Sequence, residues 1–240
     1  MDTVQRLERA WSAHAAGEFD AALADYVWLF DATAQDPATA SLRLSYVLSS
    51  WARLASEHLP ARRALVELRD RLTAQLLAAP ADAGLFNDIH ILNDKLGDLQ
   101  HTYHLFQRLP EPLAQQVGLA ALRSIMVCGD FALARRYLPD PEQHLAQAAA
   151  NLNQLKNNIN ALTNEGIAEL LADVYNYIIE VSLVLDLLDG CGDTAASERA
   201  RRQAVDLVQA PEARACVQAE LAAPGTTLDA MVELQNSVTA

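Results

Sequence analysis

A glycine-centred turn recurs four times in this sequence, each time between two amphipathic segments. A chain that folds back on itself as a helical hairpin needs a tight turn at such a point, and glycine is the residue that tolerates it best. The recurrence therefore predicts stacked helix pairs, in contrast to one enclosed core with a deep pocket. The four turns are Gly17-Glu18-Phe19, Gly97-Asp98-Leu99, Gly129-Asp130-Phe131 and Gly192-Asp193-Thr194.

Apolar residues between these turns follow a helical period. Val4, Leu7 and Trp11 share one helix face, for example, and we find no alternating strand pattern bounded by turn residues. The sequence therefore predicts an all-α protein, with proline and glycine marking the helix boundaries. In the C-terminal half, helices are expected at approximately 141–160, 164–189, 194–208, 211–222 and 226–238.

The formal net charge of −13 limits the classes of partner that this chain can bind. A negative field of this size repels nucleic acid and anionic membranes, and it attracts a basic protein, although it also simply keeps a protein soluble. The first residues lack a secretion signal, and acidic residues interrupt the apolar segment from Ile167 to Leu188, so we expect a cytoplasmic protein without a membrane span. Three cysteines without CxxC spacing resemble neither a disulfide framework nor a zinc site, and we expect no cofactor.

The turn residues resemble the tetratricopeptide (TPR) repeat, a helix–turn–helix unit of about 34 residues. In that family an aromatic residue follows the turn glycine by two positions, and a small residue comes three positions later. The matching sets are Gly17, Phe19, Ala22 and Tyr26; Gly97, Leu99, Thr102 and Phe106; and Gly129, Phe131 and Ala134.

The resemblance implies a right-handed superhelical array of antiparallel helix pairs, that is, a TPR-like α-solenoid. The interval from Gly17 to Gly97 is not a whole number of repeats, so the N-terminal third is expected to be irregular. We expect one domain over residues 1–240, with sub-boundaries, if present, near 80–84 and 139–141. A generic helical bundle with glycine at its turns remains the alternative.

In TPR proteins the concave surface commonly binds an extended peptide, and the resemblance implies the same here. Amide side chains suit this role because they both donate and accept hydrogen bonds. Asn153, Asn157 and Asn160 share one helix face, and so do Asp173, Asn176 and Glu180. The expected partner-binding residues are Asn87, Asp94, Arg123, Asn153, Asn157, Asn160, Asp173, Asn176 and Glu180.

The sequence favours a non-catalytic interaction protein that binds a protein or peptide. One version is an immunity-type or antitoxin-like protein that neutralises a basic partner, for which the net charge is the support. The first alternative is a metal-dependent helical enzyme that uses Asp88, His90, His101 and His104, but no HExxH, GxSxG or P-loop motif is present. The second alternative is a homo-oligomer that buries an apolar face of the Ile167–Leu188 helix.

Overall fold

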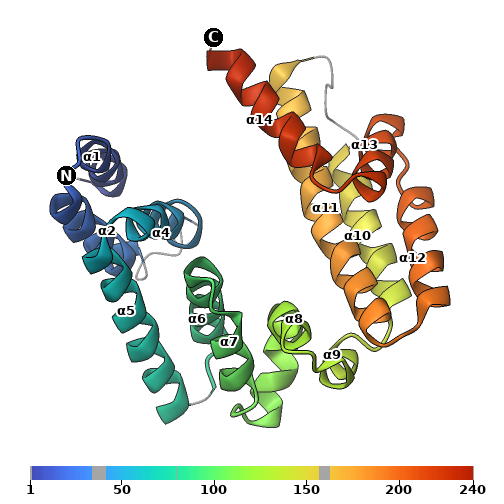
Figure 1. Ribbon diagram of the computed structural model, residues 1–240, viewed down its shortest axis with the longest axis horizontal. Helices are drawn as coiled ribbons and strands as arrows, with labels where there is room; N and C mark the ends of the chain where they lie inside the picture. Colours follow the sequence, from blue (N-terminus) through green and yellow to red (C-terminus); the bar gives the residue numbers. More distant parts are fainter. Residues whose placement is uncertain (1, 34–41, 80, 157–162, 240) are drawn as a thin grey trace. The chain divides into compact units, whose positions relative to one another are not determined.

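The computed structural model describes residues 2–33, 42–79, 81–156 and 163–239. Every regular element within these ranges is a helix, and none of them is a strand (Figure 1). The all-α prediction is therefore confirmed. None of the described helices has both the length and the apolar character that crossing a lipid bilayer requires.

The chain divides into two compact units, Met1–Cys128 and Gly129–Ala240. The division falls at Gly129, whereas the sequence placed its sub-boundaries near 80–84 and 139–141. The N-terminal unit contains α1 (Thr3–Ala15), α2 (Phe19–Thr33), a π-helical segment η1 (Arg43–Val47), α4 (Leu48–Glu57), α5 (Leu59–Ala78), α6 (Ala83–Leu96), α7 (Leu99–Phe106) and α8 (Glu111–Val127). The C-terminal unit contains α9 (Phe131–Tyr137), α10 (Pro141–Lys156), α11 (Asn164–Gly190), α12 (Thr194–Asp206), α13 (Pro211–Ala222) and α14 (Thr226–Thr239).

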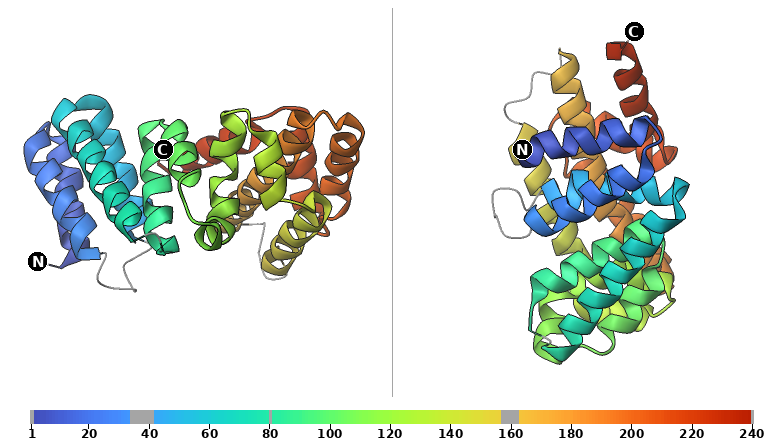
Figure 2. Two further views of the ribbon diagram at one scale, coloured as in Figure 1. Left: turned by 90° about the horizontal axis from the view of Figure 1, so that it is seen from below. Right: turned by 90° about the vertical axis from the view of Figure 1, so that its left-hand side faces the viewer.

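In the N-terminal unit, helices that follow one another in the sequence also pack against one another. Helix α1 contacts α2, α2 contacts α4, α4 contacts α5, and α5 contacts α6, so these helices lie side by side (Figure 2). Their apolar faces bury a continuous cluster that includes Leu7, Tyr26, Leu29, Trp51 and Leu65. The period of the apolar residues thus determines which face of each helix is buried.

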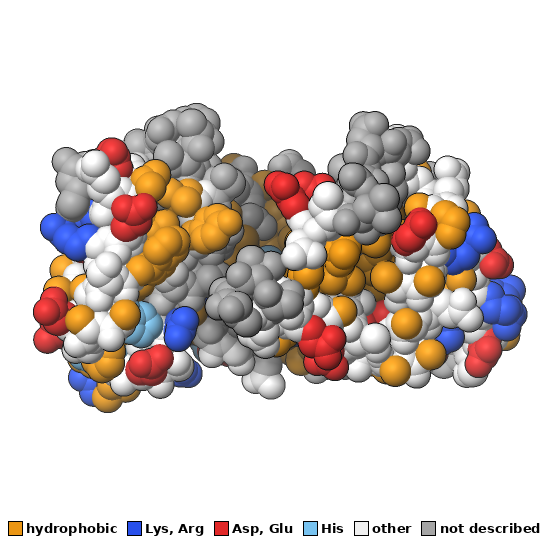
Figure 3. All heavy atoms as spheres, turned by 90° about the horizontal axis from the view of Figure 1, so that it is seen from above, with side chains coloured by type: hydrophobic (Ala, Val, Ile, Leu, Met, Phe, Trp, Pro, Cys, Tyr) orange, Lys and Arg blue, Asp and Glu red, His pale blue; other side chains and the backbone are white. Residues whose placement is uncertain are grey.

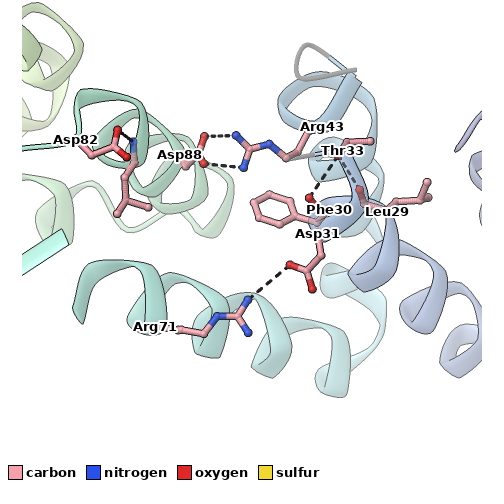
Figure 4. A network of polar contacts seen from close by, with 9 residues as sticks. Leu29, Phe30, Asp31, Thr33, Arg43, Arg71, Asp82 and Asp88 are labelled. Atoms are coloured by element: carbon pink, nitrogen blue, oxygen red, sulfur yellow. Dashed lines mark hydrogen bonds and ion pairs between the residues drawn. The ribbon is translucent and has the colours of Figure 1, made fainter. Parts of the chain in front are cut away.

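A buried ion pair joins η1 to α6 in this unit (Figure 4). The guanidinium of Arg43 donates to both carboxylate oxygens of Asp88, at 2.6 Å and 2.8 Å, and it lies over the ring of Phe30 at 5.0 Å. Both side chains are largely buried, with exposed fractions of 14% and 11%. Burial raises the pKa of Asp88, and the bonds from Arg43 oppose that rise. The pair therefore places a charge in the interior that depends on its counter-ion.

Helix α11 is the central element of the C-terminal unit. It contacts all the other helices of the unit, α9, α10, α12, α13 and α14 (Figure 1). Its buried face follows the helical period and includes Leu170, Val174, Tyr177, Val181 and Val184. The apolar face that the sequence assigned to an oligomer contact is thus covered by helices of the same unit, while Ile179 is exposed.

The turn glycines have the backbone conformation that the sequence predicts. Gly17, Gly97, Gly129 and Gly192 have φ between 71° and 78°, which is the left-handed region that L side chains rarely adopt. Acidic residues after two of these glycines cap the next helix, because Asp130 and Asp193 accept the backbone N–H groups of residues three positions later. The left-handed conformation is therefore found at all four glycines, and the helices that flank Gly17, Gly97 and Gly192 also pack against each other.

Gly190, at the end of α11, lies against the ring of Phe131 from α9. A Cβ atom at this position would come within 2.0 Å of a ring carbon. We expect Gly190→Ala to displace the ring and to lower the free energy of unfolding of the C-terminal unit by about 1–3 kcal/mol. Urea unfolding followed by circular dichroism measures this loss.

The control for Gly190→Ala is the same change in a Phe131→Ala background. Without the ring there is no clash, and alanine is the better helix former, so the substitution should then be neutral or stabilising. An equal loss in both backgrounds would show that the contact with Phe131 is not the cause.

Candidate partner-binding groove

A groove with a volume of about 300 Å³ lies between α10 and α11. Its lining combines carboxylates, amides, a histidine and a few apolar side chains. Both helices contribute lining residues. On each helix these residues are three or four positions apart and therefore share one face. The lining residues are His144, Gln147, Ala148, Asn151, Leu152, Asp173, Asn176, Tyr177 and Glu180.

The base of the groove is apolar and its rim is polar. Leu152 and Tyr177 are 2% and 3% exposed, so they form a fixed floor, whereas Gln147, Asn151 and Asn176 are exposed. The hydroxyl of Tyr177 donates to the carbonyl oxygen of Ala204 at 2.8 Å, and burial raises the pKa of this phenol. The tyrosine is thereby held as a neutral donor, and its ring forms part of the groove.

One polar contact bridges the two walls. The Nε2 atom of His144 on α10 lies 2.7 Å from Oε2 of Glu180 on α11. On α10, the amide of Gln147 donates to the Oδ1 atom of Asn151 at 3.1 Å. Within the described part of the chain, Asn176 makes no side-chain hydrogen bond, so its amide is open to a ligand. The groove thus combines the carboxylate of Glu180, which His144 holds in place, with the amide of Asn176, which is available to a ligand.

The groove lies in the more acidic part of the chain. The C-terminal unit has sixteen acidic and seven basic residues, which is a formal net charge of −9 out of the total of −13. On the face drawn in Figure 3, the basic side chains (blue) of this unit lie at its right-hand end next to some acidic ones (red), and further acidic side chains lie elsewhere on the same face. Helix α11 carries no Lys or Arg, and its six carboxylates are those of Glu165, Glu169, Asp173, Glu180, Asp186 and Asp189.

A second hollow of about 390 Å³ lies on another side of α10, and Asn153 is one of its lining residues. The amide of Asn153 donates to the carbonyl oxygen of Leu207 and accepts from the backbone N–H of Gln209, both at 2.9 Å. Both ends of this amide therefore hold the connection between α12 and α13. We accordingly give Asn153 a structural role and leave it out of the groove.

The structure brings together three of the residues that the sequence selected, Asp173, Asn176 and Glu180. Asn157 and Asn160 lie outside the described residues. In the N-terminal unit, Asp94 of α6 and Arg123 of α8 form an exposed ion pair at 3.1 Å, and Asn87 is half-buried on α6. These three positions stay predictions, because no further feature distinguishes them from a solvated helix surface.

The α10 wall of the groove was not predicted from the sequence. His144, Gln147, Ala148 and Asn151 recur at three- and four-residue spacing, which places them on one helix face. That spacing is a readable signal, but it does not tell which neighbouring helix the face meets. Packing in the folded unit decides this.

Two residues of the metal alternative are engaged in other interactions. Asp88 is paired with Arg43, and the Nδ1 atom of His101 lies 2.6 Å from the carboxylate of Asp98. Burial lowers the pKa of His90, and its Nδ1 atom has no hydrogen-bond partner within the described residues. Among the described residues, no group of three or more His, Cys, Asp or Glu side chains could hold a metal ion. The geometry gives no support to a metal centre in this region.

Comparison of the chain with protein-family models, with curated proteins and with solved structures finds no match. The groove and its chemistry are therefore the basis on which a function can be argued.

Proposed function

We propose that this protein is a non-catalytic interaction protein that binds a basic protein or peptide in the α10–α11 groove. The observation that carries the proposal is the acidic groove itself. One of its walls is formed by α11, a helix without Lys or Arg, so the groove is complementary to a cation. Amides at the rim add hydrogen bonds that a peptide backbone can use, since each amide both donates and accepts.

We also propose that the helix pairs form a TPR-like solenoid. The left-handed glycine turns and the packing of successive helices within each unit support this architecture. A stack of helix pairs is a rigid scaffold, so the residues of a groove between two helices keep their positions when a partner binds. Rigid binding surfaces lose less conformational entropy on association.

The concentration of negative charge in the C-terminal unit has a kinetic consequence. Opposite charge steers a partner toward the groove and raises the association rate, and salt screens this effect. An immunity-type or antitoxin-like protein that covers a basic partner is the specific version that we propose.

Site-specific cross-linking in the native host tests the proposal. A photo-reactive residue replaces Asn151 in the full chain, and Asn176→Lys is then added to place a cation in the groove. We expect the yield of cross-linked partner to fall at least tenfold, and to fall also as the salt concentration rises. Since Asn176 is exposed and makes no side-chain hydrogen bond within the described residues, the fold should be unaffected.

The matched control is Gln218→Lys, which makes the same change of charge at an exposed amide of α13. It should leave the cross-linking yield within about twofold of that of the parent, because Debye screening confines the effect of an exposed charge to about 8–10 Å. An equal loss with both variants, or no loss with either, would contradict binding in this groove.

A further inference from the structure

We propose that the α10–α11 groove binds the side chain of an arginine residue of the partner, an inference that rests on the proposed function. Its guanidinium would lie between Glu180 and Asn176, and its aliphatic stem would lie on the apolar floor. The size, the lining and the hydrogen-bonding capacity of the groove each support this assignment.

The size of the groove suits one long side chain. Its volume of about 300 Å³ is at the lower limit of the pockets that enclose whole drug-sized ligands. The floor formed by Leu152 and Tyr177 is apolar and buried, while the carboxylates and amides lie higher, on the walls. A side chain with an aliphatic stem and a charged head matches this division, and arginine and lysine are the two that have it.

The acceptors on α11 favour a guanidinium over an ammonium. Glu180 directs one oxygen toward His144 at 2.7 Å, so the carboxylate is held in place and its other oxygen can accept from a ligand. Asn176 lies four residues earlier on the same face, roughly 5–6 Å away at the Cβ atoms. A planar fork of five N–H donors can engage two such acceptors together, whereas an ammonium acts as a point charge.

No cation of the described chain occupies the position that we assign to the guanidinium. None of the lining residues is a Lys or Arg, and the basic residues of α12 and α13 bond elsewhere. Arg199 lies 4.0 Å from Glu142, Arg202 pairs with Glu198, and Arg214 donates to the carbonyl oxygen of Val208. Within the described residues, the carboxylate of Glu180 therefore contacts His144 and retains capacity for a cation from outside.

NMR titration of the isotope-labelled full chain tests the inference. The probe is N-acetyl-arginine methylamide, which has a single charge, and the comparison probes are the lysine and citrulline analogues. We expect the side-chain amide signals of Asn176, Asn151 and Gln147 to shift with a common dissociation constant in the millimolar range. The lysine analogue should bind at least threefold more weakly, and the neutral citrulline analogue should not bind measurably.

Two variants with the same loss of charge complete the experiment. Glu180→Gln should weaken the binding of the arginine probe at least fivefold, and Glu198→Gln, on the exposed surface of α12, should leave it unchanged. Equal affinities for the arginine and lysine probes, or equal losses in the two variants, would overturn the inference. The spectrum of each variant without probe shows directly whether it has folded.

The two proposals can fail separately. Cross-linking that depends on Asn176→Lys, together with no binding of the arginine probe, would overturn the assignment of an arginine and leave the groove as the binding site. Arginine binding together with cross-linking that ignores the groove variant would overturn the proposed function.

Discussion

Replacing Arg43 by methionine is expected to lower the free energy of unfolding of the N-terminal unit by about 3–5 kcal/mol. The side chain of Asp88 is 11% exposed, and both of its oxygens accept from this one guanidinium, so the variant leaves a buried carboxylate without its counter-ion. Methionine has a similar length and keeps the apolar contact with Phe30, so the loss reports on the charge. Urea unfolding of the variant and the parent measures it.

The effect of Arg43→Met should depend on pH. Burial already raises the pKa of Asp88, and removing Arg43 raises it further, because the bonds that favour the charged form are lost. A protonated Asp88 needs no counter-ion, so the deficit should be smallest at acidic pH and should grow as the pH rises through the raised pKa. A deficit below about 1 kcal/mol, or one that is the same at all pH values, would contradict a dependence of Asp88 on Arg43.

A double variant is the control for the ion pair. Arg43→Met combined with Asp88→Leu removes both charges and should recover most of the stability that the single variant loses. If the double variant were as unstable as the single one, lost packing around η1 would be the cause.

Replacing Trp51 by alanine is also expected to cost about 3–5 kcal/mol, here by opening a cavity. Trp51 is 2% exposed, and its ring packs edge to face against Phe30 at 6.3 Å between centroids. Its indole N–H donates to the carbonyl oxygen of Ala61 at 3.1 Å, which ties α4 to α5. Denaturant unfolding of the N-terminal unit gives the difference.

Trp51→Phe separates the two contributions of the indole. This variant keeps an aromatic ring beside Phe30 and loses the hydrogen bond to Ala61, so we expect a loss of about 1–2 kcal/mol, well below that of the alanine variant. Similar losses for the two variants would mean that the volume of the ring matters little and that the cavity argument is wrong.

The helices and their turns could be predicted because their signals are local. The φ values of Gly17, Gly97 and Gly129 follow from the need to end one helix and begin the next within a few residues. The π-helical segment Arg43–Val47 was not predicted, since its sequence reads as part of an ordinary helix. A bulged helical turn depends on tertiary context, here including the pairing of Arg43 with Asp88 on a helix 45 residues later.

The candidate groove was predicted on one wall only, for the same physical reason. The common face of Asp173, Asn176 and Glu180 follows from helical geometry, which a single segment contains. This face meets His144 and Asn151 because of the way α10 packs against α11. The sequence pattern of a single segment does not contain that packing. Asn153 was expected to bind a partner, but its amide already bonds the backbone of Leu207 and Gln209, more than 50 residues away, and so is not available to a partner.

Because α11 is central, binding of a ligand to it is linked to the stability of the whole C-terminal unit. This helix touches each of its five neighbours, so it cannot separate from α10 without loosening the rest. A guest that bridges these two helices would bind the folded form alone, and mass action would then deplete the partly opened states from which proteolysis and aggregation begin. For such a protein, binding of its partner would also lengthen its own lifetime in the cell.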